Sequence, residues 1–260
     1  MSDTPEPLSS TSVKRSTEKS RPSIFWLLAA LILPIARVMM KITIIDGHKL
    51  PRSGPFILAP NHFSEIDPIV IGIATWKMGR VPRFMAKASL FRIPVVGWLL
   101  RSSGQIPVER EGSARGKGPI EAAGDLVTIG GGVIVYPEGT LTRDPQMWPM
   151  RGKTGAARMA LTHDLPVIPV AHWGTQKVMA RYGKKVSFFP PKKITIKVGD
   201  VVDLSACADR PRDSATFAEA TNTIMNAITA ELEMIRHEDA PDERWDPTKH
   251  NQKETGRFES

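Results

Sequence analysis

Short apolar runs alternate with amphipathic stretches through the middle of this chain. Apolar runs of four or five residues predict buried strands, and apolar positions at helical spacing predict the helices between them. The strands that we expect cover residues 42–45, 56–59, 83–86, 105–108, 133–136, 167–171 and 194–198. The helices that we expect cover residues 68–78, 119–129 and 153–163, and a last helix carries Phe217, Ile224, Ile228, Leu232 and Ile235 on one face. Strands that alternate with helices indicate an α/β domain with a central, largely parallel sheet flanked by helices.

The two ends of the chain do not follow this pattern. Residues 1–22 are rich in serine, threonine, proline and charge and lack apolar periodicity, which predicts a disordered basic tail. Residues 237–260 are charged and interrupted by proline, so we expect a second, flexible tail there. The folded domain should then occupy residues 43–236, because a chain of 260 residues can bury one sizeable core.

Residues 23–42 join the first tail to the domain and predict a helical membrane anchor. The apolar run Ile24–Leu33 is too short to span a bilayer, which needs about 20 residues, and Pro34 and Arg37 interrupt it. No small-residue cleavage site of a signal peptide follows the run. We expect two short helices that lie in the membrane interface, with Pro34 at the corner. A helix hairpin in the core is the alternative, but it would leave the basic residues before the run unexplained.

The charge of the chain narrows the class of partner. The sequence has 35 basic and 27 acidic residues and a formal net charge of +8, which indicates an anionic partner such as a membrane surface, nucleic acid or a phosphorylated substrate. The single cysteine, Cys207, excludes an internal disulfide framework and fits a reducing compartment. The sequence shows no internal repeat, no glycine loop of the nucleotide-binding type and no zinc-ligand spacing, so we expect no metal and no bound cofactor.

A histidine and an aspartate lie five positions apart just after the strand at 56–59. In one continuous helix, His62 and Asp67 would be about 140° apart around the axis and could not meet. Pro68 favours the first turn of a helix and keeps the residue before it out of helical dihedrals, so we expect Asp67 to be an N-cap. The turn would then fold Asp67 back onto His62 and leave the other ring nitrogen as a base. Taken alone, the pair also fits a helix cap beside an ordinary loop histidine.

Three further strands lead into polar or basic residues. Those residues are Lys87 after the strand at 83–86, Arg110 after 105–108, and Glu138, Gly139, Thr140 and Arg143 after 133–136. Because the carboxyl ends of parallel strands meet at one edge of a sheet, these groups should converge on His62. A base among several cations suits an acceptor that carries both a hydroxyl and a phosphate. Ser64 lacks the glycine setting of a nucleophile elbow, and we expect it to hydrogen-bond within the turn.

These residues fall in four blocks that resemble the glycerophospholipid acyltransferase family, most closely the bacterial 1-acyl-glycerol-3-phosphate acyltransferases. In chain order the blocks are Asn61-His62 with Asp67, residues 104–110 (GQIPVER), residues 136–140 (YPEGT) and residues 167–170 (VIPV). Together they span residues 55–171, behind the basic interfacial segment. Two positions depart from the family. Leu141 stands where arginine is frequent, so the basic residue comes later, at Arg143, and Pro107 replaces a large apolar residue and should distort its strand.

The resemblance implies an enzyme that moves a fatty acyl group from acyl-CoA or acyl-carrier protein to the free hydroxyl of 1-acyl-glycerol-3-phosphate, giving phosphatidic acid. It implies His62 as the general base, supported by Asp67, and direct attack on the thioester without an acyl-enzyme. The acceptor-binding residues that it implies are Lys87, Arg110, Glu138, Gly139, Thr140 and Arg143. The carboxylate of Glu138 would hold the arginines rather than touch the phosphate. The implied partners are a lysophospholipid acceptor, the acyl donor and the cytoplasmic face of the cell membrane, to which the protein would attach without spanning it.

Several alternatives stay open at this point. The acceptor could be glycerol-3-phosphate, a lyso-glycolipid or an amino-lipid, although the cations favour one that bears phosphate. A catalytically silent membrane-binding module is disfavoured by the intact pair, and nucleic-acid binding by the lack of a recognition helix or aromatic platform. Lys87 and Lys153 are as readily explained as solvated lysines. We expect Trp98 and Leu99–Leu100 to be core or membrane-facing residues rather than part of a defined acyl tunnel.

Overall fold

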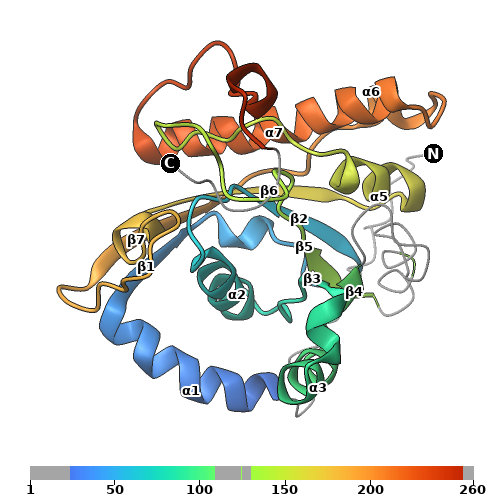
Figure 1. Cartoon of the computed structure of the whole chain (residues 1–260). Coiled ribbons are helices and arrows are strands. Elements are labelled where there is room, and N and C mark those ends of the chain that lie inside the picture. The colour runs from blue at the N-terminus through green and yellow to red at the C-terminus, as the bar shows by residue number, and fades with distance from the viewer. Residues whose placement is uncertain (1–23, 109–123, 125–129, 254–260) are drawn as a thin grey trace, which may run out of the picture.

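The computed structural model of the protein describes residues 24–108, 124 and 130–253 (Figure 1). Its main sheet has five strands in the order β1-β7-β6-β2-β5. These are β1 (Met40–Ile45), β2 (Phe56–Pro60), β5 (Gly132–Ile134), β6 (Val167–Trp173) and β7 (Lys192–Val198). All neighbouring pairs are parallel except β6 and β7, which are antiparallel. The predicted α/β fold with a mostly parallel sheet is thus confirmed, with one antiparallel junction.

A second, two-stranded sheet extends the parallel part of the fold. It pairs β3 (Met85–Lys87) with β4 (Ile106–Val108) in parallel. A parallel bridge between Phe84 and Ile134 joins β3 to the end of the main sheet at β5. The strands β2, β3, β4 and β5 therefore all end at the same edge, which is where the polar blocks of the sequence were expected to meet.

Helices cover both faces of the main sheet, so its inner strand β2 is buried on both sides. All five residues of β2 are buried. Ile57 and Ala59 share one apolar cluster with α5 (Gly155–His163) and α7 (Ser214–Arg236). Phe56 and Leu58 point to the other face and join a cluster with α2 (Asp67–Lys77) and the end of α1 (Ile24–Met39). Figure 1 shows these two layers, with α5 and α7 on one side of the sheet and α2 and α1 on the other.

The shorter elements complete the chain. They are η1 (Gly47–Lys49), η2 (Ala88–Arg92), α3 (Pro94–Ser102), η3 (Thr175–Lys177), α6 (Ser205–Ala208) and η4 (Pro247–His250). The helix α7 begins where the side chain of Asp213 accepts a hydrogen bond of 2.8 Å from the amide of Thr216, an ordinary N-cap. The helix expected over residues 119–129 lies outside the described residues except for Gly124, and so does the first tail, residues 1–22.

The N-terminal segment forms one helix instead of the two that we expected. The helix α1 runs from Ile24 to Met39 with Pro34 inside it, and β1 begins at the next residue. Ala36 and Met39 are buried in the apolar cluster with α2, and this packing holds the last turn beyond the proline. A proline inside a helix removes a hydrogen bond without always ending the helix. Among the residues that the structure describes, no helix has both the length and the apolar character needed to cross a membrane.

The segment after α7 also differs from the prediction. We expected a flexible tail from His237, but residues 237–253 pack against the domain. The ring of Trp245 stacks on His250 at 3.6 Å between centroids. The backbone carbonyl of Trp245 accepts a hydrogen bond of 2.8 Å from the amide of Arg151. Arg244 donates to Asn226 of α7 at 2.6 Å. Sequence composition did not reveal the contacts with Arg151 and Asn226, because the fold brings these partners close.

Candidate active site

Asn61 fixes the start of the turn that carries the histidine. Residues 61–67, called here the histidine turn, leave β2 at the edge where the parallel strands end. The side-chain amide of Asn61 pairs with the backbone of His172 on β6: its Oδ1 accepts from the amide at 2.9 Å, and its Nδ2 donates to the carbonyl at 3.1 Å. These two bonds continue the β2–β6 ladder by one side chain, so the turn begins from a fixed position.

The histidine turn folds Asp67 onto His62, as the sequence predicted. The Nδ1 atom of His62 lies 3.0 Å from Oδ2 of Asp67. Because a carboxylate oxygen accepts, Nδ1 carries the proton, and Nε2 keeps the lone pair that a base needs. The imidazole stacks on Tyr136 with 4.1 Å between ring centroids, and its side chain is 16 % exposed. The base is therefore oriented from two sides and still open to a substrate.

Asp67 is the first residue of α2 rather than its N-cap, which is Ile66. Its carboxylate turns back from the helix and binds the histidine turn. Oδ2 accepts hydrogen bonds of 2.8 Å from the amides of both Phe63 and Ser64. The N-cap prediction was wrong by one position because these two amides, and not those of α2, are the partners of the side chain. Ser64 does hydrogen-bond within the turn as expected, because its hydroxyl accepts from the amide of Ile66 at 3.4 Å. The same hydroxyl also donates to the distant carbonyl of Met179 at 2.7 Å.

Asp67 stays charged although it is fully buried. Burial opposes ionisation, but the imidazoles of His172 and His62 and the hydroxyl of Thr175 together hold its pKa below the usual value. Thr175 donates to Oδ1 at 2.6 Å, and Nε2 of His172 lies 3.7 Å from Oδ2. A permanent negative charge beside His62 favours the imidazolium that forms when the base takes up a proton.

His172 and Thr175 are site residues that the sequence reasoning missed. His172 is fully buried near the end of β6, and its Nε2 donates to the carbonyl of Asn61 at 2.9 Å. Burial lowers its pKa, so this second histidine is neutral near pH 7. The ring of Phe63 covers it at 4.7 Å between centroids. The available signal was position, because both residues follow the fourth block: His172 lies near the end of β6 and Thr175 at the start of η3.

Glu138 supports the histidine turn instead of holding arginines, which corrects our expectation. Its Oε1 accepts from the amide of His62 at 2.9 Å, and its Oε2 accepts from the amide of Met150 at 3.1 Å. The amide of Thr142 donates to the carbonyl of His62 at 2.7 Å, so the backbone of the histidine is held at both ends. Burial raises the pKa of Glu138 to about 8, although the hydrogen bonds from the amides of Met150 and His62 act to lower it.

The other predicted acceptor residues lie around this centre to different extents. Gly139 has a φ of +69°, which favours glycine, and a Cβ there would lie 3.0 Å from Cδ of Lys153. Lys153 thus borders the site, and its amide donates to the carbonyl of Pro137 at 2.8 Å. Arg143 is buried three positions beyond Thr140. Lys87 ends β3 at the same edge of the sheet, and Arg110 lies outside the described residues.

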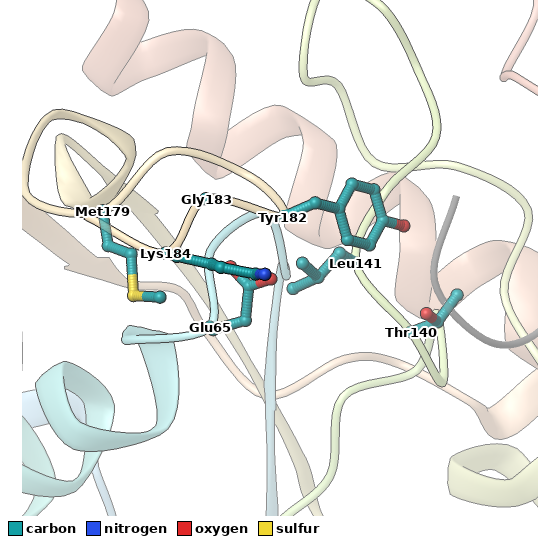
Figure 2. Close-up of a pocket in the computed structure, with 7 residues that line it drawn as sticks. All are labelled: Glu65, Thr140, Leu141, Met179, Tyr182, Gly183 and Lys184. Atoms are coloured by element: carbon teal, nitrogen blue, oxygen red, sulfur yellow. The ribbon is translucent and has the colours of Figure 1, made fainter. Parts of the chain in front are cut away.

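A surface groove opens beside the histidine turn. Its volume is about 570 Å³, and its lining residues are Glu65, Thr140, Leu141, Met179, Tyr182, Gly183 and Lys184. Figure 2 shows the charged ends of Glu65 and Lys184 on one side and the hydroxyls of Tyr182 and Thr140 on the other. The groove therefore combines polar groups from the third block with residues of the segment that follows β6.

A second, apolar cavity of about 580 Å³ lies between α1, α2, α3 and β3. Its wall begins directly after Asp67, at Pro68 and Ile69, and continues through Gly72 and Trp76 of α2. Leu99 and Leu100 also line it, whereas Trp98 is exposed. Trp98, expected as a core or membrane-facing residue, is therefore not in the core. The two leucines border an apolar cavity that sequence periodicity did not separate from the core.

Comparison with known proteins relates this geometry to one family. The profile of the family described as Acyltransferase matches residues 41–173. This range contains the histidine turn, Glu138 and His172, and it is just over half of the 260 residues.

Individual relatives agree with the profile. A 1-acyl-sn-glycerol-3-phosphate acyltransferase of Bacillus subtilis is 26% identical over 201 residues, which are 75% of this chain and 91% of the relative. A chloroplastic one of Brassica napus is 30% identical over 56% of this chain, and one of Chlamydomonas reinhardtii is 29% identical over 78%. The chain spans 43% and 58% of the length of these last two relatives.

The fold has a counterpart among solved structures. The 1-acyl-sn-glycerophosphate (LPA) acyltransferase of Thermotoga maritima superposes with a TM-score of 0.57 at 20% identity, over 86% of this chain and 87% of that one. At this identity the likeness concerns the fold, whereas the profile match covers His62, Asp67 and Glu138 of the site. The chain belongs to the acyltransferase family.

Proposed function

We propose that the protein transfers a fatty acyl group from a thioester donor, acyl-CoA or acyl-carrier protein, to the free hydroxyl of 1-acyl-glycerol-3-phosphate, giving phosphatidic acid. The observation that carries this proposal is the His62–Asp67 pair, with Nδ1 on the carboxylate and Nε2 at an open edge of the sheet. The names of the bacterial relatives include this acceptor. Membership of the family supports the reaction type.

The chain's own residues can carry the reaction in two proton transfers. Nε2 of His62 takes the proton of the acceptor hydroxyl while its oxygen attacks the thioester carbonyl. The tetrahedral intermediate then breaks its C–S bond, and the imidazolium returns the proton to the leaving thiolate. A C–O ester bond replaces the C–S bond, so the reaction balances without a metal or a redox cofactor. General-base assistance of this kind is worth about 10²–10⁴-fold in rate.

The apolar and the polar surroundings of His62 suit two different parts of the reactants, an acyl chain and a phosphate. The apolar cavity starts at Pro68 and Ile69, next to Asp67, and is the place that we propose for an acyl chain. We propose that the acceptor phosphate binds on the other side of His62, near Thr140, Gly139 and the third-block cations. Lys87, Arg110, Arg143 and Lys153 are the candidates for its partners. Glu138 acts through the backbone of the turn and shapes this site indirectly.

We further propose that α1 attaches the protein to the cytoplasmic face of the membrane without spanning it. The helix is about 24 Å long at 1.5 Å per residue, against a hydrocarbon core of about 30 Å. Its large exposed apolar residues are Trp26, Leu27, Leu31, Ile35 and Val38. A helix with such a face lies in the interface plane, where the lipid acceptor already is.

The proposed activity is tested by an acceptor screen with the purified full chain. Labelled acyl-CoA and acyl-carrier protein are each offered with 1-acyl-glycerol-3-phosphate, glycerol-3-phosphate, a lyso-glycolipid and an amino-lipid. We expect labelled phosphatidic acid with wild type and only background with His62→Ala, because the base is lost. Product with another acceptor alone would move the enzyme to that substrate. Wild-type turnover by His62→Ala, with unchanged circular dichroism, would remove His62 from the chemistry.

A further inference from the structure

The connection between β6 and β7, residues 174–191, exposes a pair of aromatic side chains. Phe188 is 59% and Phe189 82% exposed, and two prolines follow them before β7 begins. In Figure 1 this connection is the golden loop beyond β7. Two adjacent phenyl rings left exposed in the segment that leads into β7 are typical of a surface that meets an apolar partner.

Basic side chains surround the two rings. Lys184 and Lys185 precede them, and Lys192 and Lys193 follow at the start of β7. The β1–β7 register pairs Met40 with Lys192 and Lys41 with Lys193. Lys41 in β1 and Arg37 in the last turn of α1 therefore belong to the same end of the sheet. Within the described part of the chain, no ion pair involves any of these six cations. Two exposed phenyl rings surrounded by unpaired positive charge complement an anionic lipid surface.

We propose that this connection is a second membrane-contact element, in which Phe188 and Phe189 enter the lipid headgroup region and the surrounding lysines bind anionic headgroups. The inference extends the proposed attachment through α1, whose exposed Ile35 and Val38 lie near the same end of β1 and β7. An acidic carrier protein would also attract the lysines. The two exposed rings favour the lipid surface over the carrier protein. When the rings enter the lipid, the lysines around them can extend their side chains to the lipid phosphates.

The connection is tied firmly enough to the site to orient it. The bridge between Met179 and Val186 fixes the residues just before the two phenylalanines, and the amide of Ser187 donates to the carbonyl of Val178 at 2.7 Å. The hydroxyl of Ser64, in the histidine turn, donates to the carbonyl of Met179 at 2.7 Å.

Arg181 forms a second link. It donates to the carbonyls of Thr142 and Asp144 at 2.8 and 2.7 Å, and so reaches the third block. The groove of Figure 2 lies beside this connection, and Tyr182, Gly183 and Lys184 form part of its wall. Seating the phenylalanines in the membrane would bring the mouth of the groove close to the headgroups and give a lipid acceptor a short route to His62.

The test measures binding of the full chain to vesicles. We expect the double variant Phe188→Ser/Phe189→Ser to bind vesicles of phosphatidylcholine and phosphatidylglycerol at least tenfold more weakly than wild type in co-sedimentation. Val201→Ser is the matched control, since Val201 is 55% exposed but lies beyond the opposite end of β7. It should bind within twofold of wild type. Transfer to a short-chain, water-soluble acceptor should stay unchanged in the phenylalanine variant, because the two rings touch neither His62 nor Asp67.

Charge and depth are tested separately. Lys185→Gln/Lys193→Gln should weaken binding only to vesicles that contain phosphatidylglycerol, by about fivefold for each lysine. The single native cysteine, Cys207, is buried, so a polarity-sensitive label on Phe189→Cys reports that position alone. Its emission should shift to the blue on vesicles, and the same label on Val201→Cys should not respond.

Three results would overturn the proposal. One is wild-type vesicle affinity of the phenylalanine variant, and another is a label at position 189 that stays in water on bound vesicles. The third is a variant that keeps its vesicle affinity but no longer binds acyl-carrier protein, which would assign the surface to the carrier. Vesicle binding requires no turnover, so these results are independent of whether the proposed acyl transfer is correct.

Discussion

Two buried carboxylates, Asp67 at the start of α2 and Glu138 after β5, bind backbone amides of the same turn, and their pKa values move in opposite directions. Asp67 accepts four hydrogen bonds and lies beside two imidazoles, so its pKa falls although burial opposes ionisation. Glu138 accepts one amide on each oxygen, and burial raises its pKa to about 8. Equal burial gives a charged group in one place and a largely neutral one in the other, and the surrounding donors decide which.

The sharpest way to break this contrast is to remove the charge of Asp67. We expect Asp67→Asn to lower kcat to within about tenfold of the His62→Ala background, because an orienting carboxylate in a comparable triad is worth on the order of 10⁴. Steady-state transfer to 1-acyl-glycerol-3-phosphate is the measurement. Asp213→Asn is the control, since asparagine can still cap α7 and the residue lies outside the site. A kcat for Asp67→Asn near that of wild type would show that the charge does not support the base.

Glu138→Gln tests the other carboxylate through stability. The folded-state pKa of about 8 exceeds the ordinary value of 4.5, so the folded protein keeps a proton that the unfolded chain releases. The contribution of Glu138 to the free energy of unfolding is fully present below about pH 4.5. It falls as the pH rises to about 8, by up to about 1.4 kcal/mol per pH unit. Glutamine does not titrate, so this slope should be absent from the variant.

Urea unfolding of both proteins at pH 5.5, 6.5 and 7.5 measures that difference. The gap between wild type and Glu138→Gln should narrow, or change sign in favour of the variant, as pH rises. Parallel stability curves over this range would mean that Glu138 is already charged in the folded state, and the contrast with Asp67 would disappear.

The smallest expected effect concerns one donor to Asp67. Thr175→Val keeps the shape of the side chain but removes the hydroxyl that donates to Oδ1 at 2.6 Å. A hydrogen bond to a charged group is worth about 1.5–3 kcal/mol, so we expect lower stability and a roughly tenfold loss in kcat. Thr221→Val is matched, because it also removes a buried 2.6 Å hydrogen bond, to the carbonyl of Phe217 in α7, away from the site. Equal kcat in the two variants would show that Thr175 only stabilises the fold.

Local sequence signals predicted much of this site, because its central contacts are local. Asp67 reaches His62 across five positions, and Pro68 placed the turn and the helix after it. Strand positions followed from apolar runs such as Phe56–Pro60, which is buried on both faces. In each case the physical cause lies within a few residues of the signal.

The features that the sequence did not predict depend on partners far along the chain. Thr175 is 108 positions from Asp67, and His172 is 111 positions from Asn61. Their roles follow from the pairing of β6 with β2, which no local pattern specifies. The same holds for Pro34, because the helix continues beyond it only where Ala36 and Met39 find a core to pack against.

The crowding around Oδ2 of Asp67 has a consequence for where the reaction's protons can go. This one oxygen already receives Nδ1–H of His62 and the amides of Phe63 and Ser64. An oxygen so fully engaged is a poor destination for a further proton, which would have to displace a donor from the turn. The imidazole of His62 therefore keeps its Nδ1 proton throughout the proposed cycle, and only one proton is transferred between Nε2 and the reactants.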